Sequence, residues 1–168
     1  MRIPIILFLV LSISAAFGQK INMDKGATKK NPTLNRFVGK WQWCNQSDTP
    51  LFNLAIEDIN IAEYNIEMIV GYHLYKKNGD ITSSNMQNVA KSLKVKKSSV
   101  FGTKILDVTT LTGTFVDENK NKQLNLTLVL GPDGKGLNMT LKAKEGLFIG
   151  TVKEGTSLLS DVILSKTR

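Results

Sequence analysis

Two side chains could support metal ligation, proton transfer or nucleophilic attack: the chain's one histidine, His73, and its one cysteine, Cys44. A zinc site or a Ser-His-Asp triad needs several groups that converge on one point. His73 shares its parity with polar neighbours, which predicts a surface residue on the outside of its strand. A lone cysteine cannot form an internal disulfide, so we expect an inert, partly buried thiol, with a disulfide between two chains as the alternative.

Adjacent carboxylates occur twice, at Glu57-Asp58 and at Asp117-Glu118. Glycoside hydrolysis requires two carboxyl groups that face each other across a cleft, whereas acids beside a turn usually point into solvent. No glycine-rich phosphate loop precedes a helix in this sequence. We therefore predict no catalytic residues, no metal site and no cofactor, and we expect a protein that is not an enzyme.

The strands that would position any site begin with an aromatic stretch, Phe37-Val38-Gly39-Lys40-Trp41-Gln42-Trp43. Trp41 and Trp43 are two residues apart, so on a strand they point to the same face, while Lys40 and Gln42 point to the other. This pattern is typical of a half-buried strand whose aromatic side anchors a core.

The rest of the chain alternates between short apolar strands and turn residues. Asn78-Gly79 is a strong hairpin signal, and Pro132 with Gly134 marks another turn. For residues 81–99 the sequence is compatible with a loop, a helical turn or an exposed edge strand. The further strands are expected at 51–59, 64–77, 100–112, 124–130, 137–143, 147–152 and 158–164, and residues 113–116 either continue the strand at 100–112 or begin the next one.

This order predicts an all-β, single-domain protein of about eight to ten antiparallel strands. A meander of adjacent hairpins favours an up-and-down barrel, because closure removes exposed strand edges. A β-sandwich is the alternative. The barrel domain is expected to span residues 37–168.

The first residues are not expected to belong to the fold. Arg2, the apolar run 3–16 and the small residues Ala16 and Gly18 are typical of a signal peptide covering 1–18. Residues 19–36 are basic and poor in large apolar side chains, so we expect a flexible leader, although Leu34 and Phe37 could fold it back over one barrel end. The sequence thus predicts export to the periplasm, the cell surface or the medium, with no transmembrane span in the mature chain.

Taken together, the chain resembles a family of small secreted, lipocalin-like proteins of unknown function that is typical of flavobacteria and related bacteria. The opening Gly39-Lys40-Trp41 is similar to the start of lipocalins. The other matching stretches are 69–79, 111–117 and 160–166. The resemblance implies export and a calyx-like β fold, and it implies no catalytic residue.

The leading hypothesis is a barrel that binds a small apolar or amphipathic ligand. The alternative is an interaction or structural module of the cell envelope whose interior is filled by side chains. The formal net charge is +8, but the lysines of 91–97 lack interleaved aromatics, so we expect no nucleic-acid partner; we expect a monomer. The expected lining residues are Trp41, Phe52, Leu54, Ile56, Met68, Val70, Tyr72, Leu126, Leu128, Met139 and Leu141.

Overall fold

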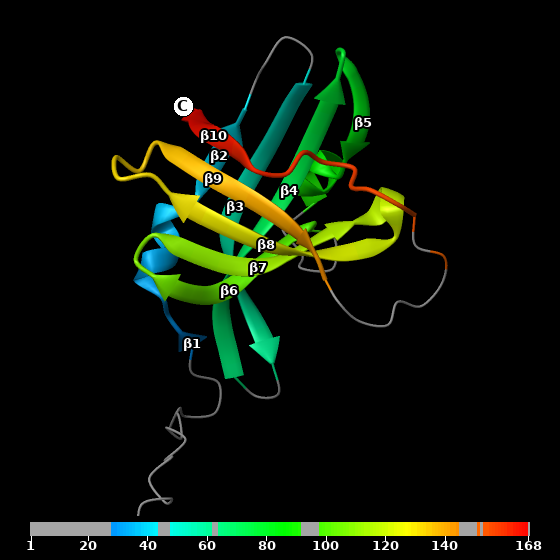
Figure 1. The fold of residues 1–168 in the computed structure, drawn as a ribbon. Coiled ribbons are helices and arrows are strands. Elements are labelled where there is room, and N and C mark those ends of the chain that lie inside the picture. The colour runs from blue at the N-terminus through cyan, green and yellow to red at the C-terminus, as the bar shows by residue number, and fades with distance from the viewer. Residues whose placement is uncertain are drawn as a thin grey trace, which may run out of the picture.

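The protein is an antiparallel β-barrel with two additional strands (Figure 1). The computed structural model describes residues 28–43, 48–61, 64–91, 98–144, 151 and 153–167. The barrel strands are β2 (Gly39–Gln42), β3 (Asp48–Ile61), β4 (Tyr64–Lys77), β6 (Val100–Asp107), β7 (Thr110–Asp117), β8 (Lys122–Leu130), β9 (Gly136–Ala143) and β10 (Val162–Thr167).

Each barrel strand pairs with the next barrel strand along the chain. The ring closes because β10 also pairs with β2. The predicted all-β, up-and-down barrel is therefore confirmed, and the sandwich alternative is not the observed fold.

Short elements decorate the ring. β1 (Thr28–Lys29) runs parallel to the start of β4, and β5 (Asp80–Ser84) forms a hairpin with the end of β4. Three 3-10 helices are described: η2 (Pro32–Arg36), η3 (Met86–Lys91) and η5 (Glu118–Lys120). The turn at Asn78 and Gly79 has positive φ at both residues, 53° and 88°, as the predicted hairpin requires.

Some expected boundaries differ from the observed ones. The strand expected at 100–112 is a hairpin, β6–β7, because the Asp107 carboxylate accepts hydrogen bonds from the Thr109 N–H and hydroxyl (2.8 and 2.7 Å) and stabilises a turn there. The last strand begins at Val162 rather than at 158. All of 92–97 lies outside the described residues, as do Cys44 and the strand expected at 147–152 except for residue 151.

The part of the expected leader that the structure describes is attached to the barrel. Leu34 in η2 is fully buried, and Phe37 beside it belongs to the same apolar core. The Trp41 indole Nε1 donates a 2.8 Å hydrogen bond to the Phe37 carbonyl. Residues 32–37 therefore pack against the barrel core, and the description of 19–36 as a flexible leader does not hold for this stretch.

The register of β4 corrects the predicted inner face of that strand. Phe52 lies opposite His73 and Leu54 opposite Gly71, and opposed residues on an antiparallel pair share a face. His73 therefore points inward and is only 4 % exposed, so its prediction as a surface residue is wrong.

Met68, Val70 and Tyr72, which were expected to line the interior, have the other parity and face outward. Val70 and Tyr72 are nevertheless buried, so hydrophobicity alone did not distinguish the two faces.

Gly71 allows the close packing on this inner face. A Cβ atom at Gly71 would lie 2.5 Å from Leu54 Cδ2 and 2.9 Å from Val100 Cβ. The absence of a side chain therefore allows β3, β4 and β6 to approach one another where the ring closes.

We predict that Gly71→Ala destabilises the fold by about 1–3 kcal/mol, because the added methyl group overpacks the interior. Gly136→Ala is the control, since its Cβ would meet only Ile163 Cγ2 at 3.9 Å, and we expect a change within about 0.5 kcal/mol. Urea unfolding of both variants measures this difference. Equal stabilities would contradict the inward orientation of Gly71.

Candidate functional site

The barrel interior is the binding site that the sequence predicts. Most of the expected lining residues do lie on its inner face: Trp41, Phe52, Leu54, Ile56, Leu126, Leu128, Met139 and Leu141. The structure places the other three, Met68, Val70 and Tyr72, on the outer face. The interior void that Phe52, Leu54, Val100 and the neighbouring leucines enclose measures about 10 Å³. That volume corresponds to roughly one water molecule, whereas ligand pockets commonly measure about 300–1,000 Å³.

A polar cluster interrupts this apolar interior around His73. The imidazole Nδ1 lies 2.8 Å from Ser99 Oγ, and Nε2 lies 2.7 Å from Ser83 Oγ. The Asn85 side-chain oxygen accepts a 2.8 Å hydrogen bond from the His73 N–H, and the Asn85 N–H donates to the His73 carbonyl. The cluster thus joins β4 to β5 and to the residues that precede β6.

A serine within hydrogen-bond distance of a histidine is also the arrangement of a nucleophile and its base. The surroundings of His73 favour a structural role. The rings of Phe52 and Phe115 flank the imidazole. Burial lowers the pKa of His73 from 6.5 to about 4, and the negative charge of Asp117 only partly opposes this shift. A histidine with this pKa is a weak base at neutral pH.

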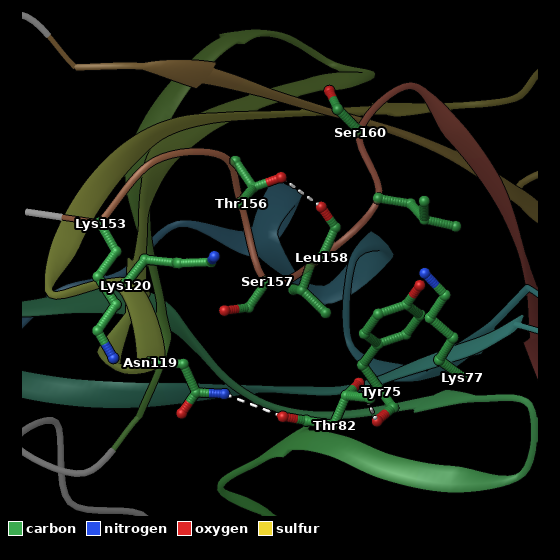
Figure 2. Close-up of a pocket in the computed structure, with 11 residues that line it drawn as sticks. Tyr75, Lys77, Thr82, Asn119, Lys120, Lys153, Thr156, Ser157, Leu158 and Ser160 are labelled. Carbon is green, nitrogen blue, oxygen red and sulfur yellow. Dashed lines mark hydrogen bonds between the residues drawn. The ribbon is translucent and has the colours of Figure 1, made fainter.

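A second candidate is an open cleft of about 570 Å³ at the barrel end that β5, η5 and the segment 153–160 surround. Figure 2 shows its lining: Lys120 and Lys153 lie on one side, and Tyr75 and Lys77 lie on the other. In Figure 1 this end lies opposite η2 and the β6–β7 turn. The full lining is Tyr75, Lys77, Thr82, Asn119, Lys120, Lys153, Thr156, Ser157, Leu158, Leu159 and Ser160.

Hydrogen bonds to one buried acid hold the walls of this cleft. Asp117, at the end of β7, is 1 % exposed. Its carboxylate accepts hydrogen bonds from the Ser157 N–H and the Ser157 hydroxyl, both at 2.6 Å, and from the Lys120 N–H at 3.2 Å. Because hydrogen bonds to a charged group are among the stronger ones, Asp117 fixes the segment around Ser157 against η5.

The same arrangement brings two lysines together. The Lys153 backbone N–H donates a 3.1 Å hydrogen bond to the Lys120 carbonyl. The two residues are therefore neighbours on the same wall of the cleft. None of the residues lining the cleft is acidic. Within the described parts of the chain, Lys77, Lys120 and Lys153 form no ion pair. The lining therefore carries three lysines and no carboxylate, although Asp117 and Asp48 contact it from behind, through Ser157 and the Tyr75 hydroxyl.

The sequence-based site prediction did not include the cleft. Its residues come from β4, β5, η5 and 153–160, and each stretch alone has the composition of a solvated turn. The sequence predicts such a solvated turn at Asp117-Glu118, whereas the structure buries Asp117 and exposes Glu118. No periodicity links positions 120 and 153, so their proximity depends on the tertiary fold.

The described residues contain no group of three or more His, Cys, Asp or Glu residues that could hold a metal ion. Their helices are all too short or too polar to cross a membrane.

We predict that His73 makes stability depend on pH. Its pKa is about 4 in the folded chain, compared with an ordinary value of 6.5, so below pH 6.5 the unfolded chain binds a proton that the folded chain does not. The contribution of the neutral His73 to the free energy of unfolding is fully present above pH 6.5. It is lost as the pH falls towards 4, by about 1.4 kcal/mol per pH unit and roughly 3 kcal/mol in all. Urea unfolding between pH 7.5 and 4.5 should show a steeper loss for the wild type than for His73→Gln.

The His73 prediction has a second readout if His73→Gln does not fold. An NMR titration of the wild-type imidazole should give a pKa near 4. A titration midpoint near 6.5, or parallel stability curves for the two proteins, would contradict the buried neutral state.

We also predict that Ser157→Ala destabilises the fold by about 1–2 kcal/mol, because the buried Asp117 carboxylate loses a hydroxyl donor. Ser165→Ala is the control, since Ser165 is exposed on β10, and we expect a change within about 0.5 kcal/mol. Urea unfolding and amide exchange at Ser157 measure the effect. Unchanged exchange at Ser157 would mean that the Asp117 contact does not hold this wall.

Comparison with known proteins identifies the family of the chain. No curated protein and no solved structure is significantly similar to it. The match to the family of unknown function DUF6705 covers residues 1–166, nearly the whole chain, so this protein belongs to that family.

Proposed function

We propose that this chain is an exported, non-enzymatic binding module that recognises an anionic ligand in the cleft between β5, η5 and residues 153–160. The observation that carries the proposal is the adjacency of Lys120 and Lys153, which a backbone hydrogen bond maintains in a lining without acids. Two lysines on one wall of a cleft without acidic lining residues produce a positive local potential, which favours a bound anion.

The barrel interior, which side chains fill, favours a scaffold role for the barrel over the role of a carrier with a ligand inside it. A void of about 10 Å³ is far smaller than the space that a lipid-like ligand needs. The side-chain-filled alternative therefore suits the described interior better than a carrier of an apolar ligand. Under this proposal the barrel supplies a rigid frame, and binding takes place at its end.

The non-enzymatic part of the proposal rests on the chemistry of the buried groups. His73 has both ring nitrogens engaged and a pKa of about 4. The carboxylate of Asp117 is engaged by Ser157 and Lys120. Neither group is positioned to act on a molecule in the open cleft.

Export is proposed from the leader. Arg2, followed by the apolar run 3–16 and by the small residues Ala16 and Gly18, has the order of a signal peptide. The resemblance to secreted, lipocalin-like proteins of flavobacteria supports the same location. The periplasm, the cell surface and the medium remain the compartments in which the cleft would meet its ligand.

The test is a titration of the mature protein, residues 19–168, with sodium phosphate at low ionic strength, with sodium chloride as the reference salt. We expect backbone NMR shifts at Lys120 and Lys153. The double variant K120Q/K153Q should bind phosphate roughly tenfold more weakly, since removing two nearby charges costs on the order of 1–2 kcal/mol.

The matched control is K40Q/K135Q, which removes two exposed lysines outside the cleft. This variant has the same net charge as K120Q/K153Q, so it separates a local site from a general charge effect. Equal weakening by both pairs would overturn the cleft proposal. A lipid-like mass retained by the purified protein in native mass spectrometry would instead favour a carrier.

A further inference from the structure

We infer that the ligand of the cleft is a linear polyanion, with at least two anionic groups on one molecule that contact opposite walls. This inference rests on the proposed function and adds the class of ligand. Lys120 and Lys153 stand on one wall, and Lys77 stands beside Tyr75 on the other (Figure 2). The cations therefore occupy two separate places rather than surrounding one point.

The size and shape of the cleft favour an extended ligand. Its volume is about 570 Å³, and it is open to solvent. Sites for molecules of drug size measure about 300–1,000 Å³, so a single phosphate ion fills only a small part. An open cleft also lets a chain continue beyond both walls.

The hydroxyl groups of the lining are already engaged by the protein. Thr82 Oγ1 donates to the Tyr75 carbonyl at 3.2 Å, and Thr156 Oγ1 donates to the Leu158 carbonyl at 2.6 Å. Ser157 Oγ donates to Asp117 at 2.6 Å. These groups brace the walls, so they offer few directional donors for reading the hydroxyl pattern of a neutral sugar.

The cleft would therefore recognise its ligand mainly through charge. Whether the charged side chains are lysines or arginines then affects which anions bind. All the cationic lining residues are lysines. A lysine ammonium acts as a compact point charge, whereas an arginine binds carboxylate or phosphate in a fixed bidentate geometry. We therefore expect phosphate, sulfate and carboxylate groups to be accepted, with the number of charges on the ligand deciding affinity.

Calorimetry of the mature protein with two phosphate probes of different valency tests this inference. Tripolyphosphate should bind at least roughly tenfold more tightly than orthophosphate at equal ionic strength, because the second contact is made within an already bound molecule. A polyuronate should also bind, through its carboxylates. Raising the salt concentration should weaken both polyanions.

Lys77→Gln provides the sharper discrimination. It should weaken tripolyphosphate binding several-fold and leave orthophosphate binding at the Lys120–Lys153 wall unchanged. Lys40→Gln is the matched control with the same change in charge, and it should affect neither probe. Equal effects of Lys77→Gln on both phosphates would overturn the two-wall assignment.

The outcomes separate this inference from the function on which it rests. If orthophosphate and tripolyphosphate bind equally well at the cleft, the polyanion assignment fails and the anion site remains. If neither binds, both fail. Binding to phosphatidylglycerol vesicles with no binding to the soluble polyanions would assign the clustered phosphates to a lipid surface and overturn the linear polyanion.

Discussion

Closure of the barrel depends on a short contact between β4 and β6. The two strands pair over three positions only, from Ile69–Gly102 to Gly71–Val100. On either side of them this edge of β4 pairs with β1 and with β5 instead, so it is shared among three partners. The His73 cluster lies where the partner changes from β6 to β5, and its hydrogen bonds to Ser83 and Ser99 connect both sides. An apolar residue at position 73 would leave these hydroxyls without the imidazole.

Closure of the ring also determines what the interior can contain. Apolar side chains from every barrel strand face inward; β6 contributes Val100, and Ile105 is partly buried against the same core. Trp41 and the residues of η2 occupy one end. The void enclosed by the described core residues leaves little room for a guest. Under the proposed function, the inner face provides stability, and binding takes place at the rim, where strands end and polar turns converge.

Asp117 connects these two roles. It lies on the inner face of β7, and its carboxylate accepts hydrogen bonds from Ser157 and Lys120, which belong to the cleft wall. A buried carboxylate is tolerated when its oxygens are satisfied by donors. The same hydrogen bonds that make burial of Asp117 possible therefore position the lysines of the candidate site.

The sequence by itself determined the class of fold and several elements in detail. Strict alternation in 124–130 and 137–143 identified β8 and β9, and the Asn78-Gly79 turn and the bounds of β4 agree with the prediction. These features depend on local geometry, because a strand alternates faces at every residue and a tight turn needs positive φ. Only the tertiary structure decided which face of β4 points inward, because its middle is buried on both sides. It alone brought Lys77, Lys120 and Lys153 to one cleft, because long-range pairing places together residues whose local sequence has no common pattern.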